Sequence, residues 1–252
     1  MKIQFMSDLH REMGASQYPF LPSGDIVVLA GDVVTSKTKK LLLDEFGNLD
    51  KPVIYVPGNH DFYGGNFDTA ISNMRAMYDF LPRRIHVLSD DHLVVGDVHF
   101  LGATLWPRIK VSEEMVVRNG ISDFISYRGF PLIEDISVEN IGLAHDLSVE
   151  YLDLMMGEIR SKNPNAKIVV VTHFPPSYQA QEERFRESNL SSYFYNELDW
   201  LIEKHQPDYW IYGHTHGNLE WEHGKTKVVT NQFGYLNREM QESFNINRTV
   251  EI

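Results

Sequence analysis

Side chains that bind metal ions gather in five short motifs of this sequence. They are Asp8, His10, Asp32, Asn59, His173, His214 and His216. Carboxylate, imidazole and amide groups in a chain without cysteine suit Mn, Fe, Zn, Co or Ni better than Mg or Ca. Asp8 and His10 stand two residues apart, as do His214 and His216, and in extended backbone such pairs point to one side. Because one bridging carboxylate would let these residues give each of two ions four ligands, the sequence predicts a two-metal centre, with Mn as the preferred metal.

Such a centre would act on phosphate esters. Two ions about 3.5–4 Å apart can clamp a phosphate and hold a bridging water whose pKa falls to about 7, which yields a metal-activated hydroxide at neutral pH. His60 directly follows the candidate ligand Asn59 and is better placed to give a proton or a compensating charge to the leaving alkoxide. Asp61 is expected to fix the tautomer of His60. His60 and Asp61 are therefore the predicted catalytic residues.

Each motif comes directly after an apolar run that is typical of a buried strand. These runs cover residues 3–6, 26–30, 53–56, 168–171 and 209–212. The carboxyl ends of buried parallel strands are where open α/β sheets place their sites. We therefore expect the motifs to meet at one edge of a largely parallel sheet or pair of sheets.

The remaining pattern predicts an α/β fold with two sheets covered by helices. Helices are expected over 37–46, 67–80, 141–159 and 196–205, and further strands over 85–88, 93–95, 98–101, 220–223, 227–230 and 249–252. In the helix over 141–159, Leu147, Tyr151, Leu154 and Met155 form the apolar stripe. Residues 106–140 and 174–195 show little periodicity, so we expect them to form irregular caps on a single domain that spans 1–252.

Composition narrows the substrate and the setting. The chain carries 23 basic and 35 acidic residues, a net charge of −12, which argues against binding of extended nucleic acid. A small phosphorylated substrate stays compatible, since two divalent cations make a pocket locally positive. No apolar run has the length of a signal peptide or a membrane span, which predicts a cytoplasmic protein without a membrane partner. The sequence does not indicate an oligomeric state.

Taken together, the five motifs resemble those of the calcineurin-like metallophosphoesterase superfamily. In order, the motifs are Ser7-Asp8-Leu9-His10, Gly31-Asp32, Gly58-Asn59-His60-Asp61, Thr172-His173 and Gly213-His214-Thr215-His216. The resemblance implies a four-layer αββα fold, a two-sheet sandwich flanked by helices. It also implies that one ion is held by Asp8, His10, Asp32 and His216. The second would be held by Asp32, Asn59, His173 and His214, with His60 as the catalytic histidine.

One departure separates the chain from the Ser/Thr protein phosphatases of that superfamily. Those enzymes carry a phosphate-binding Arg soon after the second motif, whereas Asp32 is followed here by Val33-Val34-Thr35-Ser36. The chain is more similar to small bacterial phosphodiesterase-type members, and a phosphodiesterase is the predicted activity. Phosphomonoesterase or nucleotide pyrophosphatase activity is the alternative on the same site. A non-catalytic metal-binding scaffold of the same fold is the alternative from another class.

Further residues are candidates for the substrate pocket. His145 could face the site, and an aromatic group in the second cap segment could stack on a base or aryl ring. That group is Tyr178, Phe185, Tyr193, Phe194 and Tyr195. In the first cap segment the candidates are Arg108, Arg118, Asp123, Tyr127 and Arg128.

Overall fold

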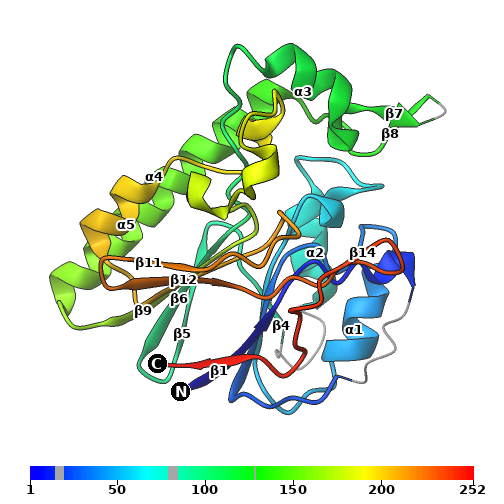
Figure 1. The fold of residues 1–252 in the computed structure, drawn as a ribbon. Coiled ribbons are helices and arrows are strands. Elements are labelled where there is room, and N and C mark those ends of the chain that lie inside the picture. The colour runs from blue at the N-terminus through cyan, green and yellow to red at the C-terminus, as the bar shows by residue number, and fades with distance from the viewer. Residues whose placement is uncertain (15–19, 79–84, 128) are drawn as a thin grey trace.

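The computed structural model describes residues 1–14, 20–78, 85–127 and 129–252. Two β-sheets lie face to face, and helices cover the outer face of each (Figure 1). The two termini lie side by side, where the Met1 amino group donates to the Ile252 carbonyl at 2.7 Å. The predicted end of the helix over 67–80 and the candidate Arg128 fall outside the described residues.

The first sheet has the strand order β15-β1-β2-β3-β4. Its strands are β1 (Lys2–Met6), β2 (Ile26–Ala30), β3 (Val53–Val56), β4 (Ile85–Val87) and β15 (Thr249–Glu251). β1 to β4 run parallel, and β15 pairs antiparallel with β1. Because β1 to β4 are parallel, the residues that follow β1, β2 and β3 emerge at the same edge of the sheet.

The second sheet has the order β11-β12-β10-β9-β6-β5. Its strands are β5 (Asp91–Val95), β6 (Val98–Ala103), β9 (Lys167–Thr172), β10 (Tyr209–Tyr212), β11 (Trp221–His223) and β12 (Thr226–Thr230). The four central strands are parallel, and both edge strands are antiparallel to their neighbours. Because β9 and β10 are parallel, the residues that follow them emerge at one edge of this sheet, where they meet the residues that follow β1 to β3.

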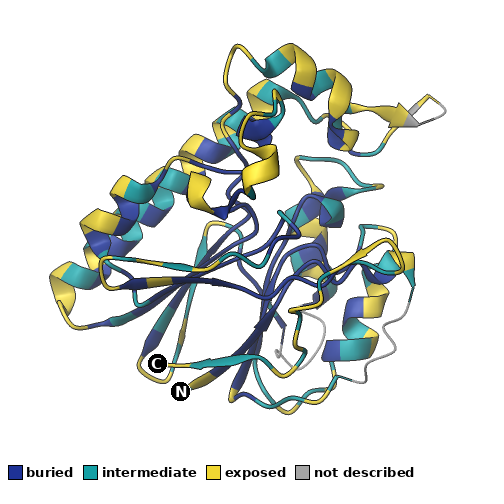
Figure 2. Ribbon diagram, in the orientation of Figure 1, coloured by how far each residue is buried: buried dark blue, intermediate teal, exposed yellow. Residues whose placement is uncertain are grey.

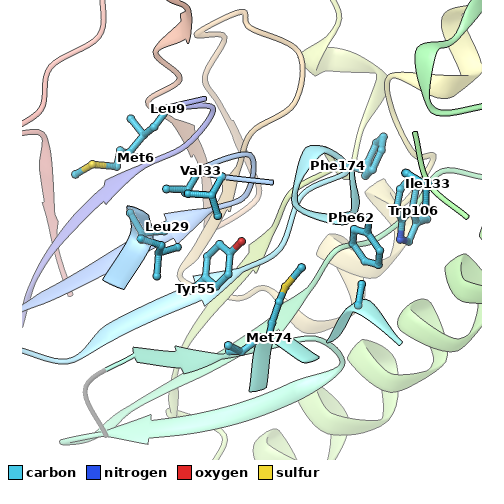
Figure 3. Close-up of a cluster of buried hydrophobic side chains, with 14 of the residues drawn as sticks. Met6, Leu9, Leu29, Val33, Tyr55, Phe62, Met74, Trp106, Ile133 and Phe174 are labelled. Carbon is cyan, nitrogen blue, oxygen red and sulfur yellow. The ribbon is translucent and has the colours of Figure 1, made fainter. Parts of the chain in front are cut away.

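Three apolar layers hold the sheets and helices together. α1 (Lys40–Phe46) and α2 (Ala70–Tyr78) pack on the outer face of the first sheet, and Figure 3 shows Met74 of α2 near Leu29 and Tyr55. α4 (Val138–Lys162) and α5 (Asp199–His205) pack on the outer face of the second. The inner strands, such as β2, β3 and β10, are buried on both faces because a third cluster fills the space between the sheets (Figure 2). The predicted four-layer αββα architecture is confirmed.

Helix α4 turns a different face to the sheet than the sequence pattern predicted. Leu147 and Leu154 of the predicted apolar stripe are 55% and 64% exposed. The buried face instead carries Ile141, His145, Ser148, Leu152, Met156 and Ile159. It lies roughly one residue, about 100°, around the helix from the predicted stripe. The prediction failed because the buried face contains a histidine and a serine, which a purely apolar stripe excludes.

The two cap segments, 106–140 and 174–195, are more regular than expected. The first contains α3 (Glu114–Gly120), η3 (Ser122–Phe124) and the short hairpin β7 (Ser126–Tyr127) and β8 (Phe130–Pro131). The second contains three single turns, η4 (Tyr178–Ala180), η5 (Glu183–Phe185) and η6 (Ser191–Tyr193). α3 and the hairpin lie above the carboxyl ends of the strands (Figure 1). Both segments therefore lie on the side of the molecule where the motifs emerge.

Candidate metal centre

All seven predicted metal ligands meet at the carboxyl ends of β1, β2, β3, β9 and β10, and every one of them is buried. The His10 and His216 Nε2 atoms lie 3.1 Å apart, and His216 Nε2 lies 3.5 Å from Asp8 Oδ1. His173 Nε2 lies 3.0 Å from Asn59 Oδ1 and 3.4 Å from Asp32 Oδ1. Asp32 Oδ2 is also 3.8 Å from His10 Nε2, so the Asp32 carboxylate stands between the two groups.

The surroundings of His173 require a positive charge. Its Nδ1 lies 2.9 Å from the Ala30 carbonyl oxygen, which can only accept, so Nδ1 carries a proton. In the neutral ring the lone pair of Nε2 then faces the oxygens of Asn59 and Asp32. Acceptors that face one another without a donor are held together only by a cation between them. A metal ion satisfies this requirement, as a proton on Nε2 would.

His10, His214 and His216 indicate the same chemistry. The Nδ1 atom of His10 donates to Glu12 Oε1 at 3.1 Å, which leaves its Nε2 lone pair facing His216 Nε2. The buried His214 Nε2 has no hydrogen-bond partner at all. A buried ring nitrogen without a partner is costly unless a ligand satisfies it. These imidazoles therefore fit a divalent transition ion, for which neutral imidazole is a preferred ligand.

The pKa values of these groups follow the same arrangement. Burial disfavours the charged form of His173, but the negative charge of Asp32 outweighs burial and raises the His173 pKa to about 9. Burial also opposes ionisation of Asp32, yet the charges of His173 and His60 hold the Asp32 pKa well below its usual value. Burial and the neighbouring His173 charge hold the pKa of His214 well below its usual value, which keeps that ring neutral. The centre therefore combines ionised carboxylate with a neutral, unpaired imidazole.

Backbone strain is concentrated at the same residues. Asp8, His10, Asp32, His214 and His216 have φ between 43° and 77°, a region that non-glycine residues rarely adopt. Such strain persists only where the surroundings impose it, and it is common at functional sites. Gly31 has φ of 90°, and a side chain there would overlap the His173 ring. The motif glycine thus lets the end of β2 approach His173 and Gly58 closely.

His60 lies at the edge of this centre and is held by residues from three parts of the chain. Its Nδ1 lies 3.2 Å from Glu12 Oε1, and its Nε2 lies 3.2 Å from the Tyr235 hydroxyl. The Tyr63 ring stacks on His60, with the ring centres 4.2 Å apart. Burial lowers the pKa of His60, but the charge of Asp32 and the hydrogen bond with Glu12 outweigh it and raise that pKa to about 9. His60 is thus an oriented imidazole that can hold a proton beside the candidate ions.

The expected contact between Asp61 and the ring of His60 is wrong. The Asp61 carboxylate accepts the backbone N–H groups of Asp32, Val34 and Gly58 at 2.7–3.2 Å. Adjacent residues point in different directions at this turn, so Asp61 fixes the loop of Asp32 while Glu12 orients His60. Asp61 therefore supports the position of the candidate ligand Asp32. Its carboxylate is engaged by three backbone amides, so the contacts do not support the prediction that Asp61 takes part in catalysis.

A pocket of about 380 Å³ opens from the candidate metal ligands towards the cap segments. Asp32, Asn59, His60, His214 and His216 form its base. Among the predicted pocket residues, Asp123, Phe185, Tyr193 and Phe194 line it. Arg108 and Arg118 instead pair with surface carboxylates, and His145 bonds the Trp106 carbonyl. Tyr178 and Tyr195 pack against each other, outside the pocket lining.

Sequence reasoning missed three residues around His60: Glu12, Tyr63 and Tyr235. Glu12 had a usable signal, because it stands two residues after His10 and so continues the alternation of Asp8 and His10. Tyr63 and Tyr235 had none, since an aromatic residue in a loop is usually a packing residue.

No helix in the described parts of the chain is long and apolar enough to cross a membrane. The chain is similar to known proteins over most of its length. It is 25% identical over 262 residues to the uncharacterized protein L509 of Acanthamoeba polyphaga mimivirus, which covers 92% of this chain and 91% of that protein.

Several solved structures, among them the following two, share the fold. One is a phosphopantetheinyl hydrolase of Mycobacterium tuberculosis, with a TM-score of 0.69, 16% identity, and coverage of 93% of this chain and 89% of the other. Another is GAP50, the anchor in the inner membrane complex of Plasmodium, with a TM-score of 0.51, 15% identity, and coverage of 100% and 77%. Residues 1–218 match the calcineurin-like phosphoesterase family, and with this match and the five motifs on one site, the chain belongs to that family of metal-dependent phosphoester hydrolases.

Proposed function

We propose that the protein is a dinuclear metal-dependent phosphodiesterase that acts on a small phosphorylated substrate. The observation that carries the proposal is the convergence of seven buried candidate ligands and an oriented His60 at the base of one pocket. Mn is our first choice among the transition metals compatible with imidazole and carboxylate, and we propose a cytoplasmic site of action.

The distances support a division of the ligands between two ions that share Asp32. Asp8, His10 and His216 lie around one side of Asp32, and Asn59 and His173 around the other, where His214 Nε2 is unpartnered. When bound, such a pair of ions supplies positive charge to the phosphate and lowers the pKa of a water between them. The residues of the chain itself fix the ligands: Ser7 Oγ and the His214 amide N–H donate to Asp8, and His216 N–H donates to Gln232 Oε1.

His60 is proposed as the acid for the leaving group. As water oxygen bonds to phosphorus, the bond from phosphorus to the leaving oxygen breaks, and that oxygen takes a proton from His60 Nε2. Glu12 supports this role because it engages Nδ1 and so directs Nε2 towards the pocket, where Tyr235 lies at 3.2 Å. General acid catalysis of this kind contributes about 10²–10⁴-fold.

The pocket supports a diester over a monoester. A monoester dianion gains most from an arginine that pairs with two of its oxygens. No arginine follows Asp32, and the residues lining the pocket include Glu182 and Glu239 but no lysine or arginine in the described parts of the chain. A diester carries a single charge, which the two ions can meet, and a volume of about 380 Å³ leaves room for a second ester arm.

The test uses substrates with the same leaving group. We expect kcat/KM for p-nitrophenyl phenyl phosphate to exceed that for p-nitrophenyl phosphate by about tenfold or more, which corresponds to about 1.4 kcal/mol of transition-state binding by the second arm. A phosphoserine peptide serves as the third substrate. If either monoester is preferred by a wide margin, the diester assignment fails and the phosphomonoesterase alternative takes its place.

Two alternatives to the phosphodiesterase assignment each have their own test. Nucleotide pyrophosphatase activity needs positive charge for a second phosphate, and the acidic pocket lining disfavours it. Its test is to assay ADP-ribose-type and dinucleotide substrates beside the diester and the monoesters. The second alternative is a non-catalytic scaffold, since GAP50, which is an anchor protein, has the same fold. Retention of His60 with all seven candidate ligands argues against it, and absence of turnover with two ions bound would favour it.

A further inference from the structure

We propose that Asp123 is a positioning residue that sets the orientation of the Asn59 amide and ties both cap segments to the metal centre. Asp123 lies in η3 of the first cap segment, far in sequence from every motif, and is only 2% exposed. The inference rests on the proposed function in one respect, that Asn59 is a metal ligand. It adds a residue outside the five motifs to the machinery that holds the second ion.

Two acceptors compete for the Asn59 amide group. Asn59 Nδ2 donates to Asp123 Oδ1 at 3.2 Å, and Asn59 Oδ1 lies 3.0 Å from His173 Nε2. In the neutral form that can bind a metal, the one ring proton of His173 sits on Nδ1 and is used on the Ala30 carbonyl, so the unprotonated Nε2 would itself attract an amide N–H. Asp123 holds the N–H on the opposite side, because a carboxylate is the stronger acceptor. The amide oxygen, which is the atom that can bind a cation, therefore stays turned towards the centre.

The same carboxylate binds both cap segments to the base of the pocket. Asp123 Oδ1 also accepts the Tyr63 hydroxyl at 2.6 Å, and Tyr63 is the residue stacked on His60. Asp123 Oδ2 accepts the hydroxyl of Tyr193, which lies in η6 of the second cap segment. One buried side chain thus has donors from the Asn59–Tyr63 loop and from the other cap segment. Because tyrosine hydroxyls can accept as well as donate, an amide at position 123 creates its fixed mismatch with the Asn59 N–H.

The variant Asp123→Asn should weaken one of the two ions. The introduced amide can place its own N–H against the N–H of Asn59. The Asn59 amide is then free to turn its N–H towards His173. Removing a residue that hydrogen-bonds to a metal ligand typically lowers metal affinity by about 10–100-fold, so we expect a loss of that size only at the site that contains Asn59. The site that lacks Asn59 should keep its affinity within about threefold.

A swapped pair of substitutions separates orientation from charge and folding. In the double variant Asn59→Asp/Asp123→Asn, the introduced amide at position 123 can donate to the introduced carboxylate at position 59. The hydrogen bond is restored with reversed polarity, and the total charge is unchanged. The single variant Asn59→Asp instead sets two carboxylates side by side and should lose the second ion under conditions where the double variant keeps it.

Two controls lie in the cap segments. Asp135 also accepts an asparagine N–H, from Asn66 Nδ2 at 2.6 Å, but it is exposed and outside the pocket lining, so Asp135→Asn should bind both ions normally. Tyr193→Phe removes one bond to the second cap segment and leaves the contact of Asp123 with Asn59. It should raise KM with little change in metal affinity.

The experiment is a calorimetric titration of the metal-free proteins with Mn²⁺, with circular dichroism to check folding. Two ions in the wild type, one weakened in Asp123→Asn and both recovered in the double variant support the inference. Equal affinities in the wild type and Asp123→Asn overturn it, while fewer than two ions in the wild type overturn the dinuclear centre itself. If Asp123→Asn does not fold, the double variant decides, since failure of a folded double variant to bind the second ion contradicts the proposed orientation.

Discussion

The base of the pocket and its cap are built by different means. The base consists of side chains that follow five strands, and their backbones are fixed by the sheets and by strained, positive φ angles. The cap consists of one short helix, a hairpin and single turns. It is joined to the base by the Asp123 carboxylate and by an aromatic group, in which the Trp106 ring centre lies 5.3 Å from those of Phe62 and Phe174 (Figure 3).

This difference suggests that the base carries the chemical step and that the cap selects the substrate. Ligands at strand ends keep their positions whatever the substrate is, because moving them would break a sheet. Turns that rest on a few contacts can change sequence without loss of the core, and loops on a rigid scaffold commonly carry specificity. We therefore expect substitutions in the base to abolish turnover and substitutions in the cap, apart from Asp123 with its contact to Asn59, to change which substrate is preferred.

The largest effect is expected for Asp32→Asn, because this residue stands between the two ligand groups. Losing one carboxylate charge should weaken both ions and lower kcat/KM by at least about 10³-fold, as electrostatic stabilisation is usually the largest single term in catalysis. Asp25→Asn is a matched control at the other end of β2, where Asp25 is exposed and accepts the Lys2 amide at 2.8 Å. If Asp32→Asn keeps both ions at wild-type affinity, Asp32 is not the shared ligand.

The next effect is expected for His60→Ala. Both ions should stay bound, and kcat should fall by about 10²–10⁴-fold for alkyl leaving groups. The loss should shrink for nitrophenolate, which leaves without a proton. Rates with a matched pair of alkyl and nitrophenyl diesters measure this. An equal loss for both substrates rejects the acid role and leaves His60 with charge stabilisation or positioning.

A smaller effect is expected for Glu12→Gln. The variant keeps the length of the side chain but weakens the hold on His60 and His10, whose Nδ1 atoms lie 3.2 and 3.1 Å from Glu12 Oε1. We expect kcat to fall by about tenfold, which is the lower end of the range for residues that hydrogen-bond to a metal ligand from outside. The part of this loss that acts through His60 should vanish in the double variant with His60→Ala, so that variant should be no slower than His60→Ala beyond any effect through His10. Additive losses would assign Glu12 a separate role.

The smallest effect is expected in the cap. Phe185 lines the pocket and is 43% exposed, so Phe185→Ala should raise KM for a diaryl diester several-fold, given about 0.5–1.5 kcal/mol for an aromatic contact. KM for p-nitrophenyl phosphate, which lacks the second arm, should not change. Val111→Ala is the control, since Val111 belongs to the same cap and is 89% exposed outside the pocket. Equal changes for both substrates would mean that the cap does not hold the second arm.

The metal ligands of the base were predictable from sequence, whereas the sequence indicated only some of the pocket-lining residues of the cap and none of their contacts. Strand ends reveal themselves through apolar runs, and a ligand such as Asp32 directly follows its run, so its place in space follows from its place in sequence. Asp123 was predicted only as a candidate for the pocket lining, and its contacts could not be predicted because its partners Asn59, Tyr63 and Tyr193 come from distant segments. The folded arrangement, and no local pattern, brings them together.

Local reasoning also failed where neighbours in sequence diverge in space. Asp61 was expected to orient His60 because it is adjacent, yet its carboxylate turns inward to three backbone amides, and Glu12 takes that position. The buried face of α4 was missed because His145 and Ser148 belong to it. His145 is accommodated there by a hydrogen bond with the Trp106 carbonyl at 3.0 Å, a contact that no helical periodicity reveals.

The central claim is that the seven side chains at the base hold two metal ions. Its most direct test is the metal content of the wild-type protein after saturation with Mn²⁺ and removal of the excess, measured by elemental analysis against protein concentration. The account predicts two ions per chain, with hydrolysis of p-nitrophenyl phenyl phosphate appearing as the second ion binds. One tightly bound ion or none, in protein that is folded by circular dichroism, would contradict it.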